Sequence, residues 1–117
     1  MKNIAETGQL GEQLVTGYLR TNGFLILERN WRVGRYEIDI IALKNECIRF
    51  IEVKTRSAGN WGSAEDAITP QKLNSLRRAA TAYLSRTRSD RDFQFDLAAV
   101  DIHPDGSSEI RYTESIL

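Results

Sequence analysis

The side chains of this sequence that could do chemistry are two carboxylates and an amine, those of Asp39, Glu52 and Lys54. Carboxylate oxygens are the protein ligands that Mg²⁺ prefers, and the bound ion usually keeps several waters. One such water, made more acidic by the metal, could attack a phosphorus atom. Lys54 could orient or deprotonate that water, or neutralise charge in the transition state. These residue types therefore point to phosphodiester chemistry.

The spacing of the two acids supports this interpretation. Residues 36–43 and 48–55 each alternate apolar and polar side chains, as strands do. If Asn45 and Glu46 form the two-residue turn of a hairpin, Asp39 lies opposite Glu52. Two carboxylates opposed across strands repel each other and destabilise the pair. A shared cation would turn this repulsion into affinity.

A purely structural interpretation fits the same spacing. The hairpin also places Glu37 opposite Lys54, where the two could form a cross-strand salt bridge while Asp39 and Glu52 face water. Exposed pairs of this kind contribute only ~0 to 1 kcal/mol. Spacing alone therefore leaves both interpretations open.

The rest of the chain supplies elements that could position these side chains. Apolar spacing predicts a helix over 4–21, and Thr69-Pro70 supplies the N-cap and first position of a helix that runs to about Arg86. Further strands are expected at 24–28 and 93–102, after the first helix and after the second, with an edge strand at 110–113. The order αβββαβ, with one extra edge strand, predicts an α/β fold: a mixed β-sheet flanked by helices.

Composition indicates an ordinary globular protein. The 117 residues suit one domain, 1–117, and 41% apolar with 27% charged residues excludes disorder and a membrane protein. The N-terminal residues lack the apolar centre of a secretory signal, so we expect a cytoplasmic protein that binds no membrane. The single Cys47 excludes an internal disulfide and is expected to be a small buried residue.

The net charge of zero argues against a nucleic-acid partner, but the charges are segregated. Residues 92–117 carry six acids and one arginine, whereas 72–91 carry six basic residues against Asp90 alone. A phosphate-facing surface would require such segregation. A solvated helix face would also produce it.

Several motifs together resemble a known family. Glu-Ile-Asp-Ile-Ile at 37–41 and Phe-Ile-Glu-Val-Lys-Thr-Arg at 50–56 resemble the signature of the PD-(D/E)xK, or restriction-endonuclease-like, nuclease superfamily. Within it, the chain resembles the YraN-like family of small bacterial proteins, which are related to archaeal Holliday-junction resolvases. The supporting features are Gly11-Glu12, Glu28 to Arg32, Trp61-Gly62, Lys72 and the Ala-x-x-x-Tyr-Leu that ends at Leu84.

The resemblance implies a restriction-endonuclease-like core and assigns roles to individual residues. Asp39 and Glu52 would be ligands of Mg²⁺ or Mn²⁺, Lys54 the catalytic lysine, and Glu12 an additional acid that approaches from the first helix. One residue departs from the pattern, because Tyr36 stands where a glycine normally precedes the first acid. We expect this change to alter packing or substrate approach and to leave the ligands in place.

The corresponding function is a metal-dependent endonuclease that acts on DNA, on a branched or otherwise unusual structure in repair or recombination. Contacts to the DNA backbone are expected from Arg56, Lys72, Arg77 and Arg78, and a homodimer would let two sites address two strands. The alternative is a non-catalytic nucleic-acid-binding or adaptor module that keeps the fold. Substrate, activity in isolation and partner are not determined by the sequence.

Overall fold

The computed structural model describes residues 4–57 and 64–117. The elements follow the order α1 (Ile4–Thr21), β1 (Leu25–Val33), β2 (Tyr36–Lys44), β3 (Cys47–Ser57), a 3-10 helix η1 (Ala64–Ala67), α2 (Pro70–Thr87), β4 (Asp92–Ile102) and β5 (Ser108–Thr113). The expected order αβββαβ with an extra edge strand is confirmed. In the described part of the chain, no helix is long and apolar enough to cross a membrane.

The five strands form one mixed sheet in the order β1-β2-β3-β4-β5. Strand β3 runs parallel to β4, and the other neighbours are antiparallel. The parallel pair requires a crossover, which α2 provides. This topology is the mixed sheet flanked by helices that the sequence predicts.

The hairpin of β2 and β3 has the register predicted from its turn. Lys44 pairs with Cys47, and the pairing continues to Ile40 and Ile51. Asn45 and Glu46 have φ values of 52° and 63°, so both lie in the left-handed region that a type I′ turn requires. The tight turn therefore sets the register of the hairpin, which brings the part of β2 that carries Asp39 beside the part of β3 that carries Glu52.

The boundaries of α2 follow from local chemistry. The Thr69 side chain accepts a hydrogen bond from the backbone N of Lys72 at 3.1 Å, and Pro70 occupies the first turn, as predicted. Arg88 ends the helix in the left-handed conformation, and its N–H is donated to the carbonyls of the last turn. The N-cap at Thr69 fixes where the helix begins and so where Lys72 lies in its first turn.

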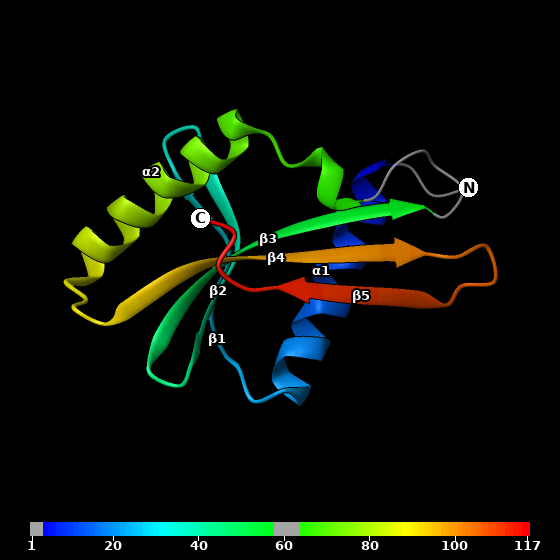
Figure 1. The fold of residues 1–117 in the computed structure, drawn as a ribbon, viewed down its shortest axis with the longest axis horizontal. Helices are drawn as coiled ribbons and strands as arrows, with labels where there is room; N and C mark the ends of the chain where they lie inside the picture. Colours follow the sequence, from blue (N-terminus) through cyan, green and yellow to red (C-terminus); the bar gives the residue numbers. More distant parts are fainter. Residues whose placement is uncertain (1–3, 58–63) are drawn as a thin grey trace.

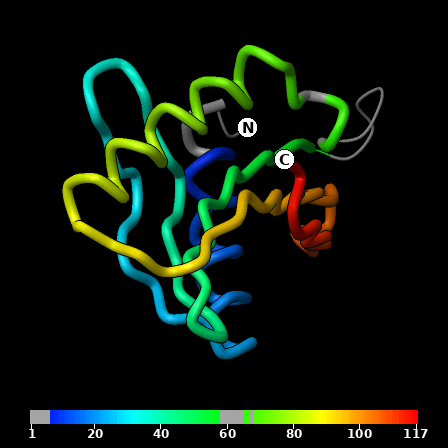
Figure 2. Tube along the Cα trace, turned by 60° about the vertical axis from the view of Figure 1, so that its left-hand side comes forward, coloured from blue at the N-terminus to red at the C-terminus, as the bar shows by residue number. Residues whose placement is uncertain are grey.

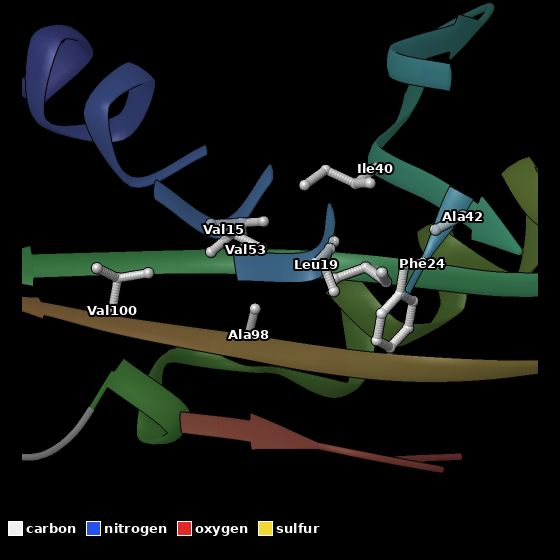
Figure 3. Packing of buried hydrophobic residues seen from close by; sticks show 9 residues of the cluster. Val15, Leu19, Phe24, Ile40, Ala42, Val53, Ala98 and Val100 are labelled. Carbon is white, nitrogen blue, oxygen red and sulfur yellow. The ribbon is translucent and has the colours of Figure 1, made fainter. Parts of the chain in front are cut away.

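The helices cover opposite faces of the sheet. In Figure 1, α1 lies behind β3, β4 and β5, whereas α2 lies in front of the hairpin of β1 and β2. Figure 3 shows Val15 and Leu19 of α1 packed over the inner strands. Leu76, Ala79, Ala80 and Tyr83 of α2 pack on the other face against Phe50 and Phe95. Each helix thus buries one apolar stripe against the sheet.

Two details of the predicted strands are wrong. The first strand was expected over 24–28, but β1 extends to Val33. Its second half is polar because β1 is an edge strand, so periodicity does not mark it as buried. In β2, Tyr36 and Ile38 were expected to share a face with Ile40, yet they pack in the α2 cluster whereas Ile40 packs in the α1 cluster. The alternation of β2 breaks at Asp39.

The expected pairing of Glu37 with Lys54 is also wrong. Glu37 pairs with Arg32 of β1, and their side chains form a salt bridge at 3.3 Å. Lys54 is instead 3.7 Å from Glu52 of its own strand. The structural interpretation of the acidic runs therefore loses the ion pair on which it depended. Cys47, expected to be buried, is half-buried at the start of β3.

Candidate metal and phosphate site

An open pocket of about 490 Å³ lies at the carboxyl end of β3. The first half of α1, the strands β2 and β3 and the first turn of α2 all contribute side chains to it. Six of the eight residues predicted for the site line this pocket: Glu12, Asp39, Glu52, Lys54, Arg56 and Lys72. The fold therefore brings together residues that are up to 60 positions apart in the sequence.

Glu52 lies at the floor of the pocket and is only 3% exposed. Its Oε1 is 3.7 Å from Nζ of Lys54 and 3.5 Å from Nζ of Lys72. Its Oε2 is buried and has no hydrogen-bond partner among the described residues. A buried carboxylate oxygen without a partner is costly, so a bound ion or polar ligand at this position would stabilise the protein.

Asp39 is held beside Glu52 by the backbone. The pairing of β2 with β3 stops at Ile40 and Ile51, one pair before the two acids. Beyond that point the N–H of Val53 donates to Oδ2 of Asp39 at 2.8 Å. The carboxylate thus replaces a backbone acceptor where the strands separate. This hydrogen bond orients the side chain, and the separation of the strands leaves room for the pocket.

Burial makes it unfavourable for Asp39 and Glu52 to carry negative charge in the pocket. Burial, and next the charge of Asp39, raise the pKa of Glu52 to about 7, against the opposing effect of the two lysines. Burial also raises the pKa of Asp39, and the hydrogen bond from Val53 opposes that shift. Both carboxylates are therefore under-compensated by protein charges alone, and a cation would favour their ionised forms.

Glu12 approaches the acids from α1 because that helix packs very closely on β3. A Cβ atom added at Gly11 would lie 1.8 Å from Oγ1 of Thr55, so only glycine permits this approach. Burial, followed by the charge of Asp39, raises the pKa of Glu12, whereas a hydrogen bond with the Asn30 side chain lowers it. Gly11 thus determines how closely α1 brings Glu12, the third acid, to Asp39 and Glu52.

The sequence does not reveal two contributions to this site. Asn30, which contacts Glu12, adopts a φ of 52° within β1, a conformation that asparagine tolerates better than most residues. Lys72 was expected only as a phosphate contact, but its ammonium lies beside Glu52. No local pattern links either residue to its acid, because each pair comes from separate elements.

The remaining predicted residues lie elsewhere. Arg78 lines a second pocket, and Arg77 is exposed on α2 and lines neither pocket. Trp31 packs edge-to-face on Tyr83, with ring centroids 5.3 Å apart. Trp61 lies outside the described residues.

Within residues 4–57 and 64–117, no three His, Cys, Asp or Glu side chains are grouped closely enough to hold a metal ion. The pocket therefore offers Asp39 and Glu52 as a pair, with Glu12 farther out. Mg²⁺ is usually bound by one or two carboxylates and completes its shell with water and substrate phosphate. Two acids with one unpartnered oxygen fit that mode of binding.

Comparison with known proteins gives a consistent family. Residues 11–100 match the uncharacterised protein family UPF0102, which corresponds to the YraN-like family that the motifs resemble. A UPF0102 protein of Syntrophomonas wolfei is 41% identical over 108 residues, which are 92% of this chain and 93% of that protein. UPF0102 protein Cphamn1_0017 of Chlorobium phaeobacteroides is 44% identical over 107 residues, 91% of this chain and 85% of its own.

Among solved structures, SfsA of Pyrococcus furiosus in complex with Ca²⁺ is 12% identical and aligns with a TM-score of 0.38. The alignment covers 97% of this chain and 64% of that chain. The relatives, by contrast, match nearly the whole chain at more than 40% identity. By that similarity, this chain belongs to the uncharacterised protein family UPF0102.

Proposed function

We propose that this protein is a nuclease that depends on Mg²⁺ or Mn²⁺ and cleaves phosphodiester bonds of DNA. The observation that carries the proposal is the unpartnered Oε2 of Glu52, buried beside Asp39 in a pocket that also presents two lysine ammonium groups. Carboxylates without compensation suit a cation, and ammonium groups at the same place suit a phosphate. A site with both is suited to phosphoryl chemistry.

The proposed ligands are Asp39 and Glu52. When bound there, the metal ion supplies Lewis-acid activation of a phosphate oxygen and of a water nucleophile. Val53 holds the Asp39 carboxylate in a fixed orientation through its N–H, so that ligand is preorganised. Glu12 adds negative charge at the rim of the pocket. Its carboxylate would accept hydrogen bonds from water molecules bound to the ion.

Lys54 and Lys72 would act on the substrate. Each ammonium lies within 4 Å of the Glu52 carboxylate, from β3 and from α2 respectively. A phosphate group in the pocket would therefore be held between two positive charges. These charges stabilise the extra negative charge that the phosphoryl oxygens develop in the transition state. Arg56, at the rim, would contact the adjoining backbone.

The choice of DNA rests on the resemblance to structure-specific nucleases and on the basic half of α2. Arg77 and Arg78 extend positive charge along that helix from Lys72. A homodimer would present two such sites to two strands. An adaptor module that binds DNA without cleaving it would use the same basic helix, and metal binding separates the two functions.

The first experiment compares melting temperatures with and without Mn²⁺ after treatment with EDTA, for the wild type, Asp39→Asn and Asp90→Asn. An ion that binds only the folded state stabilises it by about 2.7 kcal/mol at 100 times its Kd. We expect the wild type and the exposed-acid control Asp90→Asn to gain about 5 °C or more, and Asp39→Asn to gain little.

Cleavage of branched and single-stranded DNA by the same proteins then tests turnover. Metal-dependent cleavage that Asp39→Asn and Lys54→Met abolish would support the nuclease. Equal Mn²⁺ stabilisation of the wild type and Asp39→Asn would contradict the site, and metal binding without cleavage of any DNA would favour the adaptor module.

A further inference from the structure

A second pocket, of about 400 Å³, lies between the turn that joins β1 to β2 and the first half of α2. Figures 1 and 2 both show that turn beside α2. The lining residues are Arg35, Tyr36, Gln71, Asn74, Ser75 and Arg78. None of them lines the first pocket, which contains Asp39 and Glu52 and is called the carboxylate pocket below. Lys72 lines the carboxylate pocket and its chain neighbour Gln71 lines the second one, so the first turn of α2 separates the two pockets.

The lining of this second pocket suits an anion with a flat polar group attached. It offers two guanidinium groups, an aromatic ring, two side-chain amides and a hydroxyl, and no carboxylate is among the six residues. Arg35 donates a hydrogen bond to the Tyr36 hydroxyl at 3.2 Å, and its guanidinium lies 5.3 Å from the ring centroid. The charge and the ring are therefore presented together.

The lining residues that belong to α2 lie on one face of the helix, and this face is turned toward the second pocket. Gln71, Asn74, Ser75 and Arg78 recur at intervals of three and four residues, so they share one side of the helix. That side faces the turn between β1 and β2 across the second pocket. A merely solvated helix face would not need an aromatic side chain from another element opposite its arginine.

We propose that this second pocket binds an unpaired nucleotide of the DNA strand whose backbone enters the carboxylate pocket. The inference rests on the proposed function and names its substrate class: DNA in which a single-stranded segment adjoins the reacting bond. Arg35 and Arg78 bind a phosphate of that nucleotide, because guanidinium groups pair with phosphate oxygens. The base stacks at Tyr36, and the amides of Gln71 and Asn74 contact its edge.

The aromatic ring in the lining favours an unpaired nucleotide over duplex backbone. Bases stack on aromatic side chains when they have left the helical stack, whereas a paired duplex keeps its bases stacked on one another. The ring that would serve as the stacking platform is that of Tyr36, the first residue of β2, which lines the second pocket beside Arg35.

Fluorescence anisotropy in EDTA tests the proposal, because it measures binding without cleavage. The probes are labelled oligonucleotides of equal length: a single strand, a fork with a single-stranded arm and a fully paired duplex. We expect the wild type to bind the fork about tenfold more tightly than the duplex. Tyr36→Ala weakens binding of the fork about tenfold and leaves the duplex within twofold, whereas Tyr36→Phe binds as the wild type does.

Charge variants supply the second measurement. Arg78→Ala is expected to weaken fork binding and to reduce the slope of affinity against salt by about one phosphate contact. Asn74→Asp, an exposed substitution near the start of α2, places a negative charge in the pocket and weakens fork binding without burying anything. Arg20→Ala, which removes one exposed positive charge at the end of α1, is the control and changes binding by less than twofold.

The inference is overturned if Arg78→Ala and Asn74→Asp both bind the fork within twofold of Arg20→Ala, or if the wild type binds an acidic peptide and no DNA. Its failure is distinguishable from failure of the nuclease. Metal-dependent cleavage that Asn74→Asp leaves unchanged removes only the nucleotide pocket. Fork binding that depends on Tyr36, in a protein that Mn²⁺ does not stabilise, removes only the metal site.

Discussion

Two buried carboxylates at different places in the same sheet have opposite surroundings. Asp96 of β4 is fully buried and accepts hydrogen bonds from Gln94, Tyr112 and the backbone N of Ser115, with Arg49 at 3.5 Å. Glu52 of β3 is almost as buried, yet one of its oxygens has no partner in the described part of the chain. Asp96 is satisfied by the protein, and the unpartnered Oε2 of Glu52 is where we propose that the metal ion binds.

The difference also appears in the neighbouring groups. Burial, and next the hydrogen bond it donates to Asp96, raise the pKa of the Tyr112 hydroxyl, so it stays protonated as a donor. Glu114 pairs with Arg49, and Ile116 bonds to the backbone of Phe95, so the network fastens the C-terminal segment to β4. A buried carboxylate therefore stabilises the fold in one place and stores unfavourable free energy in another.

The largest expected effect comes from breaking the satisfied carboxylate. Asp96→Asn removes the charge that balances Arg49, which is 6% exposed, and should lower the free energy of unfolding by about 3 kcal/mol. Urea denaturation followed by circular dichroism measures this loss. A loss below about 1 kcal/mol would mean that Glu114 alone compensates Arg49 and that the comparison is overstated.

A smaller loss of stability is expected from disturbing the packing of α1 on β3 beside the carboxylate pocket. Gly11→Ala forces a methyl group against Thr55, so α1 must shift, and we expect a loss of about 2 kcal/mol in stability. Gly17→Ala is the matched control in the same helix, because nothing lies within 4 Å of its added Cβ. Higher helix propensity should make that variant more stable by about 0.5 to 1 kcal/mol. Equal stabilisation by both substitutions would contradict the close approach.

Neutralising the unsatisfied acid should have the opposite sign from neutralising Asp96. The folded-state pKa of Glu52, about 7, lies above its ordinary value of 4.5, so the folded protein binds more protons than the unfolded chain between those values. Without metal, the contribution of Glu52 to stability is therefore fully present below pH 4.5 and is lost as the pH rises through 7. Glu52→Gln avoids this loss.

We expect Glu52→Gln in EDTA to be more stable than the wild type by about 1 to 2 kcal/mol at pH 8, with little difference at pH 4. Midpoints of urea denaturation at the two pH values provide the measurement. A variant that is less stable than the wild type at pH 8 would show that Lys54 and Lys72 already compensate the carboxylate.

The smallest expected effect concerns the partner of Glu37. A double-mutant cycle between Glu37 and Arg32 should give a coupling of about 0.5 kcal/mol or less, because Arg32 is exposed. The cycle between Glu37 and Lys54 should give none within error. A larger coupling in the second cycle would restore the salt bridge that the structure replaces.

Much of the site could be predicted from the sequence because the hairpin is local. The two-residue turn at Asn45 and Glu46 fixes the register within a few residues, so it brings Asp39 next to Glu52. The strand separation beyond Ile40 was not predictable, since it accompanies the change of face by which Ile38 packs in the α2 cluster and Ile40 in the α1 cluster. Where the strands separate, the two acids line a pocket.

The sequence by itself determined the helices, the N-cap of α2, the tight turn and the acidic pair, because hydrogen bonds and periodicity act over neighbouring residues. Only the tertiary structure decided that Lys72 lies beside Glu52, that Gly11 lies against Thr55 and that Arg35 faces Arg78 across a hollow. Each of these pairs joins separate elements. Their distances follow from the packing of whole helices on the sheet, which no local pattern encodes.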